Sequence, residues 1–180
     1  MKSYLPSIRY SFFMLVGGVL GLAASAALTI EKIFLLEDPN YKLSCSLNEI
    51  FACGSVVTTE QASVFGFANS ILGVVLFPVL ITLGLIGISR NSLPNYFKYG
   101  LFLGLTFGHL FVLWLAYQSL YVIGALCPWC MVVWAVTVPL SLLSIAEVWP
   151  EKRNLSVIAN LAIFGWFAIL FALIFVRFYI

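Results

Sequence analysis

Charged residues are scarce in this chain, and their scarcity excludes a water-soluble globular domain. They make up 9% of the 180 residues, whereas a soluble domain carries roughly 25%. Hydrophobic residues make up 63%, and the mean hydropathy is +1.09. The formal net charge of +2 is too small for a nucleic-acid-binding surface. The chain also lacks internal repeats, low-complexity tracts and linkers, so we expect one domain over residues 1–180.

Long apolar runs take the place of charge. A helix that crosses a bilayer needs about 20 apolar residues at a rise of 1.5 Å each. Five segments meet this requirement, at about residues 10–30, 70–88, 96–123, 127–148 and 155–176. The fold class that they predict is an all-α membrane protein with five transmembrane helices.

The only long polar stretch, residues 31–65, is expected to be a loop at one membrane surface. Residues 38–40 read Asp-Pro-Asn and predict a turn. Thr58 and Gln61 have the spacing of a helix capping box, and a capping role is also the simplest expectation for Thr59.

The distribution of Lys and Arg predicts the orientation of the spans. Six lie near span ends on one side, namely Lys2, Arg9, Arg90, Lys98, Lys152 and Arg153. Three lie on the other side, namely Lys32, Lys42 and Arg177. Because Lys and Arg accumulate on the cytoplasmic side, we expect the N-terminus in the cytoplasm and residues 31–65 on the outer face. We expect the cytoplasmic (inner) membrane of a prokaryote, with all four cysteines on an oxidising face.

A Cys-x-x-Cys pair opens the fourth apolar segment. A c-type haem site would need a histidine directly after Cys130, and that residue is Met131. Pro128 suits the first position of a helix, which would place Cys127 near the N-cap and Cys130 one turn further on. A thiolate at a helix N-terminus has a lowered pKa and exchanges more readily. The motif therefore favours a redox-active dithiol over two incidental buried cysteines.

The second pair, Cys45 and Cys53, lies in the predicted outer loop. A loop pair can pass electrons between a soluble partner and an anchored pair by thiol–disulfide exchange. The alternative is a static disulfide that ties the loop down, which would explain Cys45 and Cys53 but not the second pair. A four-thiolate metal site is disfavoured in an oxidising compartment, so we predict no metal.

The sequence around these cysteines resembles the vitamin K epoxide reductase family, most closely its bacterial branch. The resemblance runs from about the first span through the fourth helix. It rests on Cys45-Ser46, Ala52-Cys53-Gly54-Ser55-Val56-Val57, Gln61-Ala62-Ser63, Phe65-Gly66-Phe67, Asn69, Tyr117-Gln118-Ser119-Leu120-Tyr121 and Cys127-Pro128-Trp129-Cys130. One departure is Ala68, where many bacterial members have proline, so the entry to the second helix can differ.

This resemblance implies a four-helix bundle around a quinone, with a peripheral fifth helix. It also implies a quinone-dependent thiol oxidase that takes electrons from a thioredoxin-fold partner and supports disulfide formation in exported proteins. The quinone is of the menaquinone, ubiquinone or phylloquinone type. Many bacterial members carry a fused thioredoxin-like domain after the fifth helix. The sequence ends at that helix, so we expect a separate partner, either exported or membrane-anchored.

The resemblance also implies roles for the cysteines. Cys45 would meet the partner, Cys53 would attack the anchored pair at Cys127, and Cys130 would face the quinone. Two alternative functions remain open. The first is a reductase whose product is the reduced quinone or quinone epoxide, and the second is a membrane scaffold or transporter with structural disulfides.

Other residues are predicted to hold the quinone or to support the bundle. The family uses an amide at the position of Asn69 to bind a quinone carbonyl, although Asn69 could equally cap the second helix. Trp134 matches an aromatic position against the ring, and Tyr117 and Gln118 are further candidate contacts. Two aromatic residues, Trp129 and Tyr121, are expected in an interfacial belt. For His109, in the middle of the third span, we favour an interhelical hydrogen bond over a proton path.

Overall fold

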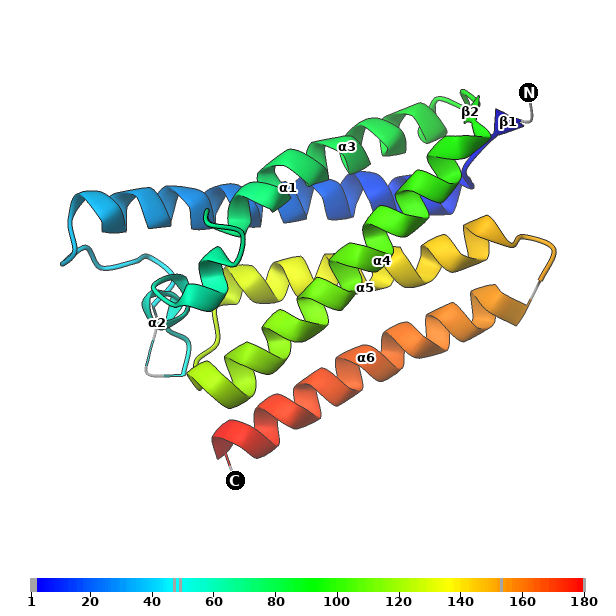
Figure 1. Cartoon of the computed structure of the whole chain (residues 1–180). Coiled ribbons are helices and arrows are strands. Elements are labelled where there is room, and N and C mark those ends of the chain that lie inside the picture. The colour runs from blue at the N-terminus through cyan, green and yellow to red at the C-terminus, as the bar shows by residue number, and fades with distance from the viewer. Residues whose placement is uncertain (1–2, 47, 49, 153, 180) are drawn as a thin grey trace.

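Five long helices run along the molecule in the computed structural model, which describes residues 3–46, 48, 50–152 and 154–179 (Figure 1). These are α1 (Ile8–Glu37), α3 (Ser70–Ile88), α4 (Asn95–Tyr117), α5 (Pro128–Val148) and α6 (Asn154–Tyr179). The short elements are β1 (Ser3–Tyr4), α2 (Cys53–Val57), the 3-10 helix η1 (Glu60–Ser63), β2 (Leu93–Pro94) and the π-helix η2 (Gln118–Ile123), which continues α4. All five long helices are long and apolar enough to span a membrane, which confirms the predicted fold class.

The predicted spans agree with the helices, with one informative difference. The bounds of α3 match the prediction, and α5 begins at Pro128 with Cys127 as its N-cap. Helix α1, however, continues past the apolar run to Glu37, into the segment predicted as loop. Two polar side chains in this extension have partners in the structure. Glu31 accepts hydrogen bonds from Ser44, and Lys32 Nζ donates to the Val57 carbonyl over 2.7 Å.

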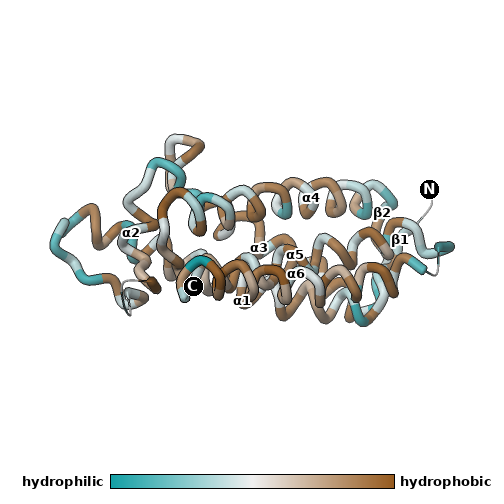
Figure 2. The backbone as a smooth tube through the Cα atoms, turned by 90° about the horizontal axis from the view of Figure 1, so that it is seen from below, coloured by the Kyte–Doolittle hydropathy of each residue, from teal (hydrophilic) through white to brown (hydrophobic). Residues whose placement is uncertain are grey.

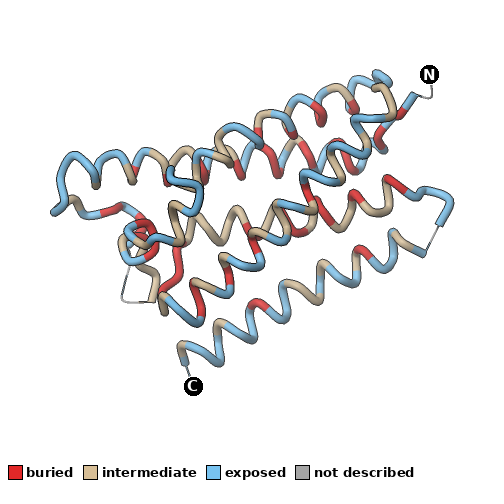
Figure 3. Tube along the Cα trace, in the orientation of Figure 1, coloured by how far each residue is buried: buried red, intermediate tan, exposed pale blue. Residues whose placement is uncertain are grey.

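Four of the helices form a bundle and the fifth lies outside it. Helix α1 packs against α3 and α5, and α4 packs against α5. Helix α6 lies along α5 and remains largely exposed, as Figure 3 shows. Glycines allow α1 and α3 to approach closely, because a Cβ at Gly84 would lie 2.8 Å from the backbone nitrogen of Leu15. The outer faces of the helices carry many exposed apolar side chains, as expected for surfaces in contact with lipid.

Hydrophilic residues gather mainly at the two ends of the bundle (Figure 2). One end holds α2, the cysteines and the C-terminal end of α6, and the other holds the paired strands β1 and β2. At the strand end, Glu147 of α5 accepts hydrogen bonds from Tyr4 and Ser7 and so anchors the start of α1. Burial and the nearby Glu147 raise the pKa of Tyr4. Lys2 and Arg153, which contributed to the orientation prediction, lie outside the described residues.

The expected turn is present, but the expected capping box is wrong. The Asp38 side chain accepts from the Asn40 N–H over 2.9 Å and shapes the turn at residues 38–40. Thr58 ends α2 rather than starting a helix, and its Oγ1 donates to the Gly54 carbonyl. Thr59 precedes η1 without a capping bond from its side chain and donates instead to the Val56 carbonyl. Both threonines therefore satisfy the carbonyls at the end of α2, which local spacing alone does not reveal.

Candidate redox site

The two cysteine pairs meet at one end of the bundle. Cys45 and Cys53 form a disulfide, and Cys127 and Cys130 are free thiols. The Cys53 Sγ lies 3.3 Å from the Cys127 Sγ, although 74 residues separate them in the sequence. The structure therefore brings all four predicted cysteines to the same end of the molecule. The two sulfurs are within van der Waals contact, the distance from which an exchange between the pairs can begin.

Backbone hydrogen bonds hold this contact in place. The Leu126 N–H donates to the Ile50 carbonyl over 2.7 Å, and the Ala52 N–H donates to the Leu126 carbonyl over 3.0 Å. These two bonds form a parallel bridge between Phe51 and Leu126, which lie two residues before Cys53 and one residue before Cys127. The connection that reaches this bridge begins at Gly124, whose φ of 71° lies in the left-handed region that favours glycine.

The π-helix η2 supports the same connection. The Ser119 hydroxyl donates to the Ala125 carbonyl over 3.0 Å. On the opposite side, Arg177 of α6 donates its Nε–H to the Leu120 carbonyl over 3.1 Å. A turn of π-helix leaves backbone carbonyls without their usual α-helical partners, so side chains can bind them. Helix α6 therefore contacts two elements, namely α5 and the π-helix η2 that leads to Cys127.

Cys127 is the N-cap of α5, as the sequence predicts. Its sulfur accepts from the Cys130 N–H over 3.4 Å, and Pro128 occupies the first turn. A hydrogen bond from the Cys130 thiol lowers the pKa of Cys127, and the backbone N–H groups of Trp129 and Cys130 lower it further. Burial and the negative charge of Glu31 oppose this effect without cancelling it. The arrangement stabilises a thiolate at Cys127, the sulfur that contacts Cys53.

The other side of the site is more enclosed than expected. Cys45 is 6% exposed and Cys53 is fully buried. Glu31, itself 7% exposed, accepts from both the backbone N–H and the hydroxyl of Ser44, the residue before Cys45. In this state Cys45 does not present its sulfur at the surface, contrary to the role implied by the resemblance.

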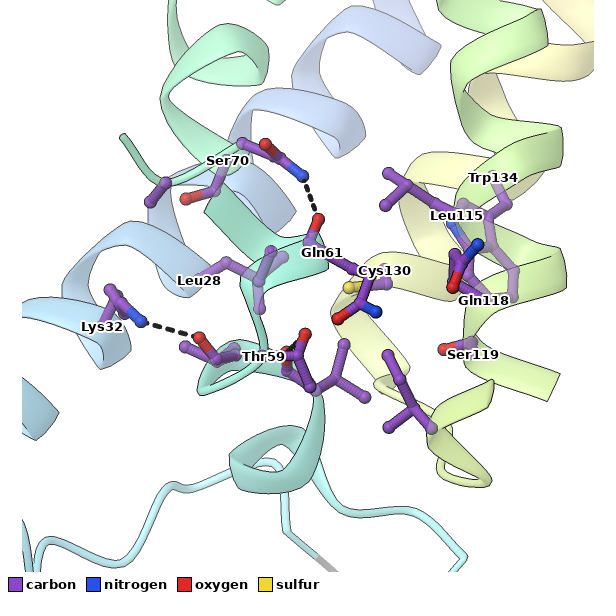
Figure 4. Close-up of a pocket in the computed structure, with 16 residues that line it drawn as sticks. Leu28, Lys32, Thr59, Gln61, Ser70, Leu115, Gln118, Ser119, Cys130 and Trp134 are labelled. Carbon is purple, nitrogen blue, oxygen red and sulfur yellow. Dashed lines mark hydrogen bonds between the residues drawn. The ribbon is translucent and has the colours of Figure 1, made fainter. Parts of the chain in front are cut away.

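Below the cysteines lies a cavity lined from α1, α2, the η1 segment, α3, α4, η2 and α5 (Figure 4). Its walls include Lys32, Gln61, Asn69, Gln118, Cys130 and Trp134. It shares Asn69, Cys130 and Trp134 with a second, larger hollow of about 440 Å³ that extends between α3 and α4. That hollow is almost entirely apolar and includes Gly100 and Gly104 of α4. The bundle therefore has room for a flat ring beside Cys130 and for an apolar chain attached to it.

Three of the four predicted quinone contacts lie at this cavity, and one does not. Asn69, Trp134 and Gln118 line it, and Trp134 is 2% exposed. Tyr117 was predicted to contact the quinone, but its side chain is 57% exposed and its ring lies 5.2 Å from that of Tyr121. The end of α4 turns Tyr117 outward and brings Gln118 to the inner wall, so Tyr117 does not line the cavity. Tyr121 is half exposed, as expected for an interfacial residue.

Asn69 occupies the N-cap position of α3, but its side chain makes no capping hydrogen bond. Its side-chain nitrogen donates to the Gln61 carbonyl over 2.7 Å, and its side-chain oxygen accepts from the Val64 N–H over 3.2 Å. The alternative role as a helix cap is therefore wrong, and the amide instead holds the η1 segment over the cavity.

Two further predictions concern residues outside the cavity. Trp129 packs against the buried cluster around Cys53 and Cys127, and its indole nitrogen is buried without a partner among the described residues. The indole nitrogen of Trp129 therefore does not reach the surface of the protein. His109 shares a hydrogen bond between its Nδ1 and the hydroxyl of Ser141, which joins α4 to α5 and confirms the interhelical bond.

Lys32, Gln61 and Glu31 belong to the site but were not selected from the sequence. Lys32 follows Leu28 by four residues on α1, so it lies on the same helix face, and both side chains line the cavity. That spacing could have identified Lys32. Gln61 and Glu31 carry no periodic signal, because their positions depend on contacts with Asn69 and Ser44, which lie outside the helix or turn that holds each of them.

Comparison with known proteins assigns a family to this arrangement. A family model described as "Vitamin K epoxide reductase family" matches residues 12–145. The match includes all four cysteines and the whole of α3 and α4, and it stops within α5. No curated protein matches the chain.

Proposed function

This chain belongs to the vitamin K epoxide reductase family, and from that premise we propose that it is a quinone-dependent thiol oxidase. In this proposal, electrons pass from a thioredoxin-fold partner through Cys45–Cys53 and Cys127–Cys130 to a membrane quinone. Membership indicates an oxidoreductase that links cysteines to a quinone. The direction, the partner and the roles of individual residues are our inference from the site.

The cycle begins with the loop disulfide. A partner dithiol reduces the Cys45–Cys53 disulfide, and the partner leaves with a disulfide of its own. The Cys53 thiolate then attacks Cys127 of a Cys127–Cys130 disulfide and releases Cys130. Cys45 attacks Cys53 in turn, which restores the loop disulfide and leaves Cys127 and Cys130 reduced.

The second half of the cycle takes place at the cavity. The Cys127–Cys130 dithiol closes to a disulfide and gives up two electrons and two protons. A quinone in the cavity takes both pairs and becomes a quinol, so the atoms and electrons balance. The quinone is the acceptor that supplies the oxidising power, and the residues of the chain position it and exclude water.

One observation carries the proposal, namely the 3.3 Å contact between the Cys53 and Cys127 sulfurs. Static disulfides would need no such contact between a bonded sulfur and a free thiol. The bonding pattern is also that of one intermediate, in which the loop pair is oxidised and the anchored pair is reduced. In the proposed cycle this is the state that follows internal exchange and precedes quinone reduction.

The hollow between α3 and α4 supports a quinone as the acceptor. Ligand sites are mostly apolar and contain a few well-placed polar groups. This hollow has apolar walls, and the polar residue Asn69 lines it at the end nearest the cysteines. Cys130 lines both the hollow and the smaller cavity. We therefore place the ring beside Cys130 and Trp134, with its apolar chain between the two helices.

The proposal is tested by single-turnover quinone reduction. Purified protein is reduced with dithiothreitol, freed of the reductant and mixed anaerobically with a short-chain quinone, and quinol formation is followed by absorbance. We expect up to one quinol per dithiol in the wild type and none with Cys130→Ala. A matched variant, Cys45→Ala, should still reduce quinone in this assay but should lose turnover with a thioredoxin-fold dithiol protein. Equal quinol formation by the wild type and Cys130→Ala would contradict the proposal.

The direction of the physiological reaction is tested separately. If the protein serves instead to reduce a quinone epoxide, the epoxide should also act as an acceptor in the same assay. We expect the simple quinone to react much faster than the epoxide. A faster reaction with the epoxide would favour the reductase function.

A further inference from the structure

Arg177, in the last turn of α6, binds the segment that leads to Cys127. Its Nε–H donates to the carbonyl of Leu120, a residue that is itself 2% exposed. A guanidinium nitrogen also lies 3.9 Å from the point where a Cβ on Gly124 would stand, so the side chain reaches the C-cap of η2. Helix α6 lies beyond residues 12–145, the part of the chain that matches the family, so the match does not include the donor of this bond.

A row of apolar side chains sets the position of α6 against the bundle. Four residues of α6, spaced by four, pack within the cluster that contains Leu120 and Leu126, namely Trp166, Leu170, Ile174 and Phe178. Residues four apart are neighbours on a helix surface, so one side of α6 is seated on this cluster. The same seat holds Arg177 at the level of η2, where its hydrogen bond forms.

Three hydrogen bonds fix the path from η2 to Cys127. The Gly124 N–H donates to the Ser119 carbonyl over 3.0 Å, and the Ser119 hydroxyl donates to the Ala125 carbonyl over 3.0 Å. The bond from Arg177 to η2 is the third, and it is the one of the three whose donor comes from another helix. Because the connection from η2 to Cys127 is short, a shift of η2 would move the sulfur.

We propose that Arg177 is a positioning residue for the exchange between the two cysteine pairs. In that step of the proposed function, the Cys53–Cys127 bond forms, the Cys127–Cys130 bond breaks, and Cys130 takes the electron pair as a thiolate. Such an attack needs the reacting atoms in contact and aligned, and the Cys53 and Cys127 sulfurs lie 3.3 Å apart. Arg177 acts by holding η2, and through it Cys127, against the loop that carries Cys53. The inference rests on the proposed function and adds a role for α6 to it.

An arginine suits this task at the end of a membrane helix. Its guanidinium keeps its charge, and a hydrogen bond from a charged donor is stronger than one from a neutral donor. Its apolar stem can lie along the helix while its head group stays near the membrane surface. Lysine would keep the charge and a donor but not the planar geometry, which makes Arg177→Lys the conservative variant.

The equilibrium between Cys53 and Cys127 tests the inference. In the Cys45→Ser/Cys130→Ser protein, the effective concentration of these two thiols is measured by equilibration with reduced and oxidised glutathione, followed by alkylation and mass spectrometry. We expect Arg177→Ala to lower this effective concentration by about three- to tenfold, as for the loss of one hydrogen bond from a charged group. Arg177→Lys should recover most of the loss, because it keeps a charged donor.

Two controls separate positioning from a general loss of structure. Lys42→Ala removes a positive charge from an exposed position of the same loop and should leave the effective concentration unchanged. The loop disulfide provides the second control, because its two cysteines are close in the chain and do not depend on η2. In a protein with both cysteines of the anchored pair replaced by serine, Arg177→Ala should leave the effective concentration of the loop pair unchanged.

Equal effective concentrations of Cys53 and Cys127 with arginine and with alanine at position 177 would overturn the inference alone. An equal fall in the loop pair would also overturn it, because the substitution would then loosen the whole cysteine end. If the parent protein formed no disulfide between Cys53 and Cys127, the relay in the proposed function would fail and this inference with it.

Discussion

Glu31 shows how one buried side chain can govern access to a redox centre. Its carboxylate holds Ser44, and the sulfur of the adjacent Cys45 is enclosed. Exchange with a partner requires an in-line approach to that sulfur, and we expect the Glu31–Ser44 contact to open for this approach. On this hypothesis the barrier to partner reduction depends on hydrogen bonds one residue away from the cysteine.

Removing one of these bonds should speed the reaction with a partner. We predict that Ser44→Ala increases the rate at which an external dithiol reduces the Cys45–Cys53 disulfide, by roughly fivefold for the loss of about 1 kcal/mol. The rate is measured by quenched alkylation and mass spectrometry. Asn40→Ala, in the exposed turn at residues 38–40, serves as the control. A rate equal to that of the wild type would mean that the Glu31–Ser44 contact does not limit access.

The lowered pKa of Cys127 gives a prediction with a definite sign. A lowered pKa keeps the thiolate populated at lower pH, and exchange slows as the pH falls through that pKa and the sulfur is protonated. The Cys130 thiol is the largest cause of the shift. In a protein with Cys45 and Cys53 replaced by serine, Cys130→Ala should therefore move the ultraviolet absorbance transition of the Cys127 thiolate to higher pH. Cys130→Ser keeps a donor and should move it less, whereas identical transitions would contradict the assignment.

Individual residues were predictable where the physics is local. Cys127 and Pro128 occupy the positions that helix capping predicts, and the backbone N–H groups of the first turn lower the pKa of Cys127 as expected. The burial of Glu31 and the outward direction of Tyr117 were not predictable in this way. They depend on Ser44 and on the π-helix that follows α4, and neither contact is visible in the spacing of nearby residues.

At the scale of helices, close packing between α1 and α3 depends on glycine. A Cβ at Gly84 would lie 2.8 Å from Leu15 N and 2.9 Å from Ser11 O, which are backbone atoms that cannot move aside. A Cβ at Gly104 of α4 would meet nothing within 4 Å, because that position borders the hollow between α3 and α4. These two glycines thus have opposite surroundings in neighbouring helices.

We predict opposite effects for the same substitution at the two positions. Gly84→Ala should destabilise the protein by about 1–3 kcal/mol through overpacking. Gly104→Ala should be neutral or slightly stabilising, because alanine favours a helix over glycine by roughly 1 kcal/mol. Thermal unfolding in detergent measures both. A larger loss of stability at Gly104 than at Gly84 would contradict the packing described here.

The helices themselves were largely predictable, and their ends less so. The length of the apolar runs predicted both ends of α3 to the residue, and it predicted the start of α5 at its N-cap, Cys127. The same criterion underestimated the length of α1, because a helix ends where its backbone hydrogen bonds end and not where its apolar run ends. The residues of α1 beyond the apolar run are held by contacts to Ser44 and Val57.

For the whole molecule, the proposed function requires the cysteine end to face an oxidising compartment. The bias of Lys and Arg predicts that this is the outer face of the membrane. We predict that a membrane-impermeant maleimide labels Cys45 in intact cells after mild reduction and before lysis. A periplasmic and a cytoplasmic marker protein with accessible thiols provide the controls. Labelling that appears only after lysis would reverse the orientation and remove the exported partner from the proposal.

The most direct measurement is the formation of a disulfide between Cys53 and Cys127, whose sulfurs lie 3.3 Å apart. In the Cys45→Ser/Cys130→Ser variant, these two cysteines are left without their partners within each pair. After mild oxidation and proteolysis, we predict that mass spectrometry finds the two cysteine peptides joined in nearly every molecule, at a rate independent of protein concentration. Two free thiols, or disulfides only between different molecules, would contradict the relay between the pairs.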